Sequence, residues 1–294
     1  MQADVRILVV GDLIRDVDVH GVCSRFAQES AGCPVFAETR REERAGGAGA
    51  VAVMATGLGA TVGLIAGPND SVKYRHFVDD RQVWRHDLDA PSLTAPEVAS
   101  LADEVRDELT AVWDAVLIAD YGKGACQHAV VRAAIDGATR SGITCLVDPA
   151  HGVDWRTYRG ATAIKCNRPE WMAASASHAF DWWKELVPNV IVTDGDRGLH
   201  HFYGTDCDSY PARAAKLVDV TGCGDMVLAG LGVCLSLGRT WPDACRFANV
   251  VASLKAERRG AIAVTLSLPA YLSPHSLLSA LPRTPLLSLD EGVV

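Results

Sequence analysis

The stretch AVLIADYGKGACQHAVVRAAIDGATRSGITCLVDP, residues 115–149, decides the class of fold. Residues 115–119 and 144–147 are short apolar runs with the length of buried strands. Between them, residues 127–141 carry apolar side chains at helical spacing. A strand, a helix and a second strand in this order predict two parallel strands covered by a helix.

The same alternation continues on both sides of this stretch. Further strands are expected at residues 6–10, 162–165 and 189–193, and further helices at residues 95–112 and 241–258. The sequence therefore predicts an α/β fold, a doubly wound, mainly parallel sheet between two layers of helices, over residues 1–265. Residues 266–294 contain four prolines and are expected to form an irregular tail.

Two segments, residues 17–41 and 72–87, break the alternation. In the second segment, Asp79-Asp80 is a natural turn between two strand-like halves. We expect these segments to form a small β-lid beside the main sheet. Because exposed strand edges tend to pair with other chains, we also expect a homodimer through the lid.

Composition narrows the range of partners and locations. The formal net charge of −8 gives no basic footprint, so neither nucleic acid nor an anionic membrane is an expected partner. Nine cysteines occur without a CxxC pair, which favours reduced thiols. No apolar run approaches the ~20 residues that span a bilayer, and the first residues resemble a strand more than a signal peptide. The expected location is the cytoplasm.

The segment DVTGCGD, residues 219–225, precedes a long apolar helical run at 226–237. Gly222 and Gly224 allow a tight turn whose N–H groups point at one spot, and the helix adds the positive end of its dipole. Such a turn suits a phosphoryl group in transfer, and Asp225 would accept the proton of an acceptor hydroxyl. Taken alone, the segment also fits an ordinary glycine-rich turn with an acidic first helical turn.

DVTGCGD and its apolar helix resemble the signature of PfkB-type, ribokinase-like carbohydrate kinases, usually DTxGAGD with a catalytic final Asp. Three further landmarks of that family appear in order, at residues 44–50 (RAGGAGA), 167–170 (NRPE) and 193–198 (TDGDRG). The resemblance implies a ribokinase-like three-layer fold and an ATP-dependent kinase that uses Mg²⁺. It also implies that Asp225 is the base, with the backbone of Gly222, Cys223 and Gly224 as the anion hole.

A narrower resemblance is to the D-glycero-D-manno-heptose-7-phosphate kinase branch of that family, and DYGKG at 120–124 is its most specific motif. It implies sugar contacts from Asp12, Asp16, Gly46, Gly47 and Asp120. The candidate anchors for a phosphate on the acceptor are Arg25, Arg44, Lys73, Arg75 and Lys123. Each aspartate also fits a turn or cap, and each basic residue also fits a solvated surface. Some members of the branch are fused to a nucleotidyltransferase, and this chain is expected to be the kinase part alone.

The nucleotide side follows from the same resemblance. The implied nucleotide-binding residues are Asn167, Thr193, Gly195, Gly198, Asn249 and Gly260. Glu170 is expected to orient a magnesium-bound water, because Mg²⁺ keeps several of its waters. Asn167 and Glu170 fit a helix N-cap and its first turn equally well.

Two features depart from the family pattern. Ala50 stands where the family usually carries an Asn that bonds sugar hydroxyls, and the chain after Gly67 lacks a βαβ unit of ~30 residues. A more open or partner-completed substrate pocket is therefore expected. The leading hypothesis is a sugar or sugar-phosphate kinase. The alternatives are a kinase for another polyol, such as a pentose, hexose, cyclitol or nucleoside, and a non-catalytic binding protein on the same fold.

Overall fold

A computed structural model describes residues 4–176, 181–212 and 217–257 of this chain. Gly260 and the expected tail at 266–294 lie outside the described residues.

The main sheet has eight strands, in the order β12-β11-β10-β9-β8-β7-β1-β4. Across the sheet from β10 to β4, in the order just given, neighbouring strands pair in parallel. Strands β11 and β12 are antiparallel and complete the sheet on the β10 side. The strands are β1 (Arg6–Gly11), β4 (Thr61–Ala66), β7 (Ala115–Ala119), β8 (Thr144–Asp148), β9 (Ala163–Asn167), β10 (Asn189–Thr193), β11 (Leu199–Tyr203) and β12 (Asp206–Tyr210). The predicted α/β fold is confirmed, and the antiparallel edge is the part that the sequence did not predict.

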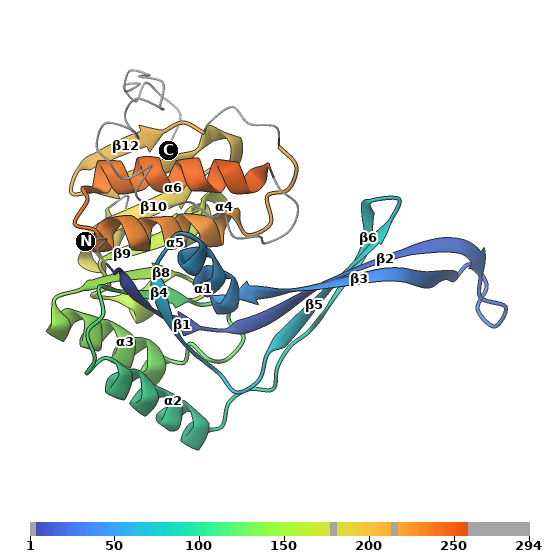
Figure 1. Ribbon diagram of the computed structural model, residues 1–294, viewed down its shortest axis with the longest axis horizontal. Helices are drawn as coiled ribbons and strands as arrows, with labels where there is room; N and C mark the ends of the chain where they lie inside the picture. Colours follow the sequence, from blue (N-terminus) through green and yellow to red (C-terminus); the bar gives the residue numbers. More distant parts are fainter. Residues whose placement is uncertain (1–3, 177–180, 213–216, 258–294) are drawn as a thin grey trace.

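Helices cover both faces of this sheet (Figure 1). One layer consists of α1 (Ala48–Gly57), α5 (Cys223–Ser236) and α6 (Trp241–Ala256). The other consists of α2 (Ala95–Glu108), α3 (His128–Ser141) and α4 (Arg168–Ser175). Short 3₁₀ turns occur at Trp155–Tyr158, Trp182–Glu185 and Gly195–Arg197. Central strands such as β7 are buried along their whole length, which explains their continuous apolar sequence.

A second sheet of four strands projects from the α/β body (Figure 1). Its order is β3-β2-β5-β6, formed by β2 (Leu13–Phe26), β3 (Pro34–Gly47), β5 (Ser71–Val78) and β6 (Arg81–Leu88). Asp79 and Asp80 have φ angles of 49° and 61°, as a two-residue hairpin turn requires. We call this sheet the lid. Its strands extend beyond the expected segments, because β2 continues directly from β1 and β3 runs on into α1.

No helix among the described residues is long and apolar enough to cross a membrane.

The candidate active site lies where the carboxyl ends of the parallel strands meet the lid, the position at which open α/β sheets bind ligands.

Candidate active site

Helix α5 begins at the predicted phosphate-binding turn. Gly222 is its N-cap, with a left-handed φ of 76° that favours glycine. The N–H of Cys223 donates to Val220 O at 3.1 Å, and the N–H of Met226 donates to Gly222 O at 3.0 Å. In the described part of the chain, the N–H groups of Gly224 and Asp225 are therefore the open donors of this helix end. The Cys223 N–H, which we expected to bind phosphate, is used inside the turn.

Asp225 lies in the first turn of α5, and its carboxyl group is withdrawn from water. Its Oδ1 accepts a hydrogen bond from the hydroxyl of Tyr121. Burial raises the pKa of Asp225 to about 6, and the Tyr121 hydrogen bond and the Lys165 ammonium act in the opposite direction. A carboxyl group with a pKa near neutrality is well matched to proton abstraction at physiological pH.

Lys165, in the middle of β9, places a buried ammonium beside this turn. Its Nζ donates to Asp148 Oδ2 at 2.7 Å, and a Cβ on Gly224 would stand only 2.8 Å from the same nitrogen. Burial lowers the pKa of Lys165, but attraction to carboxylates, with Asp148 the strongest, outweighs burial and raises it. The protonated side chain therefore adds positive charge where the helix N-terminus already favours an anion.

A second buried lysine, Lys255 on α6, supports the chain just before the turn. Its side chain has no solvent exposure, and its Nζ donates to Asp219 O at 3.1 Å. The N–H groups of Val218 and Asp219 donate to Ala256 O at 2.8 and 3.0 Å. These bonds attach the segment leading to Gly222 to the end of α6.

The DYGKG motif forms the loop between β7 and α3. The carboxylate of Asp12 is buried and accepts bonds from the N–H groups of Tyr121 (2.8 Å), Lys123 (3.0 Å) and Ala125 (2.7 Å). Asp120 accepts bonds from Gly122 N–H (2.9 Å) and the Tyr158 hydroxyl (2.8 Å), and burial raises its pKa to about 6. Both aspartates shape the loop in this structure, so the expected sugar contacts of Asp12 and Asp120 stay predictions.

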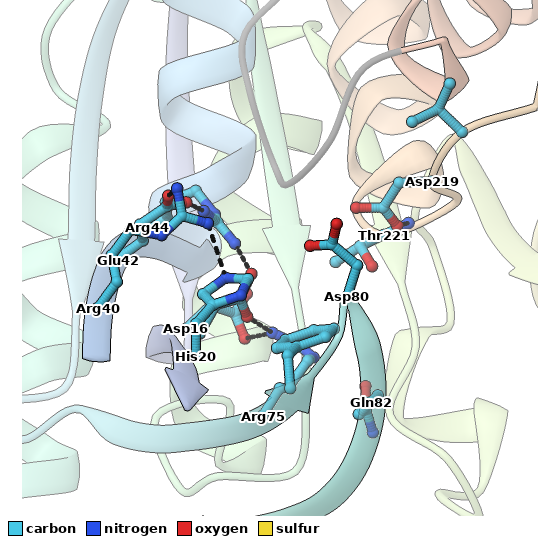
Figure 2. A pocket seen from close by; sticks show the side chains of 13 residues that line it. Asp16, His20, Arg40, Glu42, Arg44, Arg75, Asp80, Gln82, Asp219 and Thr221 are labelled. Atoms are coloured by element: carbon cyan, nitrogen blue, oxygen red, sulfur yellow. Dashed lines mark hydrogen bonds and ion pairs between the residues drawn. The ribbon is translucent and has the colours of Figure 1, made fainter. Parts of the chain in front are cut away.

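A cleft of about 440 Å³ lies between the lid and the body. Figure 2 shows lid side chains along one side and Asp219 and Thr221 on the other. The arginines in this cleft are all paired. Arg75 contacts Asp16 at 2.9 Å. Arg44 bonds Asp18 and also Glu42 at 2.9 Å, and Arg40 contacts Glu42 at 3.0 Å.

The remaining predicted substrate residues separate into near and distant groups. Gly46 lies against the cleft, because a Cβ there would stand 2.6 Å from Asp16 Oδ2, and Gly47 leads directly into α1. Arg25 lies near the far end of the β2–β3 hairpin, beside Val35 in register. Ala50 is buried and belongs to the core cluster that packs on α1.

Two of the candidate phosphate anchors, Lys73 and Lys123, differ in their contacts. Lys123 Nζ contacts Asp89 at 2.5 Å. The Nζ of Lys73 lies 5.2 Å from the centroid of the Tyr121 ring, and Lys73 forms no ion pair with any described residue. Burial lowers the pKa of Lys73, with partial compensation by Asp16. Among the described residues, Lys73 is therefore the predicted phosphate anchor near the cleft that has no ion pair.

Most of the residues predicted to bind the nucleotide lie at the ends of β9 and β10 or just after them. Asn167 and Glu170 cap α4 reciprocally, with bonds of 2.9 and 2.8 Å, so the capping alternative is realised. Thr193 donates its hydroxyl hydrogen to Cys166 O at 3.2 Å. Gly195 and Gly198 bound the short turn after β10. This turn is held by Asp194, whose pKa is lowered overall because pairing with Arg197 and Arg168 outweighs burial.

Asn249, predicted for the adenine pocket, lies on α6. Its amide nitrogen donates to Tyr210 O at 3.2 Å and to Pro211 O at 2.7 Å. It therefore fixes the chain after β12 in this structure, and its contact with a nucleotide stays a prediction.

The sequence reasoning missed the side chains that surround Asp225, namely Tyr121, Asp148, Lys165 and Lys255. One signal was present for Lys165: a lysine inside the apolar run AIKC of a buried strand requires a charged partner. Tyr121 belonged to a quoted motif, but only the fold shows that its hydroxyl reaches Asp225.

A doubly wound α/β body, a β-lid over the strand ends, and an aspartate at a glycine-rich helix N-terminus define a ribokinase-like kinase. Solved structures support this fold. *Escherichia coli* phosphofructokinase-2 in complex with fructose-6-phosphate matches with a TM-score of 0.68 at 16% identity, over 92% of this chain and 99% of that one. *Arabidopsis thaliana* ribokinase complexed with ribose and ATP matches with a TM-score of 0.66 at 15% identity, over 95% and 98%.

The sequence matches the family model of pfkB family carbohydrate kinases over residues 92–267. The bifunctional protein HldE of *Bradyrhizobium diazoefficiens* is 32% identical over 321 residues, covering 93% of this chain and 64% of that protein. HldE of *Stutzerimonas stutzeri* is 31% identical over 300 residues, covering 88% and 62%. The chain thus spans a little under two thirds of the length of these curated relatives. It belongs to the PfkB family and is a carbohydrate kinase.

Proposed function

We propose that this kinase transfers the γ-phosphoryl group of ATP to a hydroxyl of a sugar phosphate resembling a heptose 7-phosphate. The observation that carries the proposal is Asp225, a desolvated carboxylate with a pKa of about 6 at the N-terminus of α5. Its position allows it to take the proton of an acceptor hydroxyl while the helix end receives the phosphoryl group.

The charge on the transferred group meets donors from two elements. The N–H groups of Gly224 and Asp225 point from the start of α5, and the Lys165 ammonium lies beside Gly224. Phosphoryl transfer depends mainly on such positioning and charge stabilisation. The attack itself requires the acceptor hydroxyl to lie between Asp225 and the terminal phosphate.

Glu170 fits a role as a contact for a magnesium-bound water. Its Oε2 caps α4, and burial raises its pKa with a further contribution from Asp148, against the hydrogen bonds from Asn167. Carboxylate oxygens of this kind are suitable partners for the waters that Mg²⁺ retains. Mg²⁺, when bound, neutralises charge on the phosphates of the nucleotide.

The ammonium of Lys73, which forms no ion pair with a described residue, supports a phosphorylated acceptor. The other candidate cations near the cleft are ion-paired, and Arg25 lies far along the hairpin. The resemblance of the DYGKG region to the heptose-phosphate branch and the HldE relatives support the same substrate class. A screen that measures ADP release with a panel of sugars and sugar phosphates tests this function. Turnover with unphosphorylated sugars alone contradicts the proposed acceptor class.

A second candidate, phosphorylation of an unphosphorylated polyol, is favoured by the charge of the cleft. Its lining contains the three arginines described above and five carboxylates, namely Asp16, Asp18, Glu42, Asp80 and Asp219. Carboxylates accept hydrogen bonds from hydroxyl groups, and an acidic lining opposes a phosphate. The same screen separates the two candidates.

Lys73→Met is expected to raise KM for a phosphorylated acceptor by ~10-fold or more, the size of a lost hydrogen bond to a charged group. KM for ATP should stay unchanged. Steady-state kinetics with matched phosphorylated and unphosphorylated acceptors measure the effect. Lys123→Met is the control, because this lysine already contacts the exposed Asp89. Equal changes for both kinds of acceptor would contradict the role of Lys73 as a phosphate anchor.

We also propose a homodimer through the outer face of the lid. This face, turned away from the cleft, carries Val17, Val19, Phe36, Tyr74, His76, Trp84 and His86. Trp84 is 59% exposed, and such an aromatic sheet face is typical of an interface. Light scattering at micromolar concentration should give twice the 31.3 kDa chain mass, and Trp84→Glu should lower it. A monomeric mass for the unaltered protein contradicts this proposal.

A further inference from the structure

Tyr121 is held in a fixed position beside the proposed base. Its own N–H donates to Asp12 at 2.8 Å, and the next residue donates its N–H to Asp120 at 2.9 Å. These bonds hold the backbone of the loop in place at Tyr121. The hydroxyl at the end of this ring donates to Oδ1 of Asp225.

The surroundings of Tyr121 keep its hydroxyl a hydrogen-bond donor. Burial, followed by the nearby Asp225 and Asp148 charges, raises the pKa of Tyr121 well above its usual value, so the phenol stays protonated. The Lys73 ammonium lies over the ring face, 5.2 Å from its centroid. A cation at this place draws electron density from the ring and strengthens the hydroxyl as a donor.

We propose that Tyr121 is a positioning residue that orients Asp225 and keeps it ionised for its role as the base. By occupying Oδ1, the Tyr121 hydroxyl leaves Oδ2 to face the acceptor hydroxyl, since no described residue donates to Oδ2. The proton then moves from the acceptor hydroxyl to Oδ2 as the new phosphoryl bond forms. This role rests on the function proposed above.

Other charges also bear on Asp225, and the effect of Tyr121 must be separated from theirs. The charged and titratable groups that influence Asp225, besides Tyr121, are Asp16 of β2, Asp148 of β8, Lys165 of β9, Lys255 of α6 and Cys223 of its own helix. The two aspartates favour protonation of Asp225, and Lys165 opposes it. Among these groups, Tyr121 is the one that donates a hydrogen bond to the carboxylate. Its removal leaves the others in place.

Tyr121→Phe removes this hydroxyl while keeping the ring beneath Lys73. The bond favours the charged form of Asp225, so its loss should raise the pKa of this carboxyl group. The acidic limb of the pH profile of kcat/KM should then move to higher pH by about one unit or more. A shift of the Asp225 pKa from about 6 to about 7 would lower its ionised fraction, and with it turnover, by about two-fold at pH 7, with KM for ATP unchanged. Tyr203→Phe is the matched control, because Tyr203 also donates to a carboxylate, that of Asp208 on β12, and lies beside the start of β10, away from the predicted site. This variant should leave the limb in place.

Two further variants keep the test decisive. Tyr121→3-fluorotyrosine, a stronger donor with nearly the same shape, should move the limb to lower pH even if Tyr121→Phe folds poorly. In an Asp225→Asn background, Tyr121→Phe should cause little additional loss, because the two act as one unit. An unshifted acidic limb in both Tyr121 variants overturns the inference. Retained activity of Asp225→Asn alone overturns instead the proposed function on which it rests.

Discussion

Asp225→Asn is expected to fold normally and to lose turnover by at least ~10²-fold, the lower range for a positioned general base. The amide preserves the size of the side chain and can still contact the Tyr121 hydroxyl, but it cannot accept the acceptor proton. ADP release at saturating ATP measures the loss, and unchanged ATP affinity shows that the nucleotide site is intact. Turnover within a few-fold of the unaltered protein removes Asp225 from the role of base.

The pH dependence gives a second measurement of the same carboxylate. Activity requires its ionised form, so turnover should fall as pH drops through about 6. The stability of the fold depends on pH in the opposite sense, because burial raises the pKa of Asp225 above its value in the unfolded chain. Protonation of Asp225 therefore favours the folded state below about pH 6, and ionisation costs stability above it. Asp225→Asn should thus unfold at an equal or higher temperature than the unaltered protein at pH 8. A markedly lower unfolding temperature would contradict this account of the carboxylate.

The parts of the fold that could be predicted are those in which burial dictates the residue pattern. The strands at 115–119 and 189–193 were predicted with their observed bounds, because both are buried on both sides and read as continuous apolar runs. The antiparallel strands β11 (LHHFY) and β12 (DCDSY), of which β12 forms the edge of the sheet, contain histidines, aspartates and a serine. Such an antiparallel edge needs no apolar run, so the same reasoning gave no strand there.

The turn at the start of α5 could also be predicted, because its chemistry is local. Gly222, Gly224 and Asp225 lie within four consecutive residues, and the apolar helix follows at once. By contrast, the hydrogen bonds of the Asp12 carboxylate and the Tyr121 hydroxyl join residues more than 100 positions apart in the chain. Sequence patterns placed both residues near the site, but only the packing of the strands determines which atoms they contact.

The lid shows a third limit of sequence reasoning. Its arginines looked like a set of phosphate anchors in an acidic protein, yet Arg44 and Arg75 each pair with a carboxylate on the neighbouring strand β2. Arg40 pairs with Glu42 on its own strand. Cross-strand pairing of this kind is set by register, in which Asp16 faces Arg44 on one side and Lys73 on the other. This register could not be read from the sequence pattern. It also places Lys73 opposite Asp16, whose carboxylate pairs instead with Arg75.

The turn itself is tested by two neighbouring substitutions with opposite expected results. Gly224→Val should lower turnover by ~10²-fold or more, the size expected when an anion-stabilising donor is lost. Even a Cβ at this position would stand 2.8 Å from Lys165 Nζ, which Asp148 holds in place. The larger valine side chain would displace the ammonium and block the approach of the phosphate. Turnover and ATP affinity should fall together, while the unfolding temperature reports whether the body is intact.

Cys223→Ala should be nearly silent in the same assays. The N–H of Cys223 is used by Val220 O, and its Sγ lies 3.7 Å from Ala252 O, toward α6. Burial raises the pKa of this thiol, so the reactive thiolate form is disfavoured. The alanine variant retains the backbone turn and removes only these weak sulfur contacts. If Cys223→Ala is inactive while folding and ATP affinity are intact, the thiol takes part in the reaction, and the assignment of this turn to backbone phosphate binding is wrong.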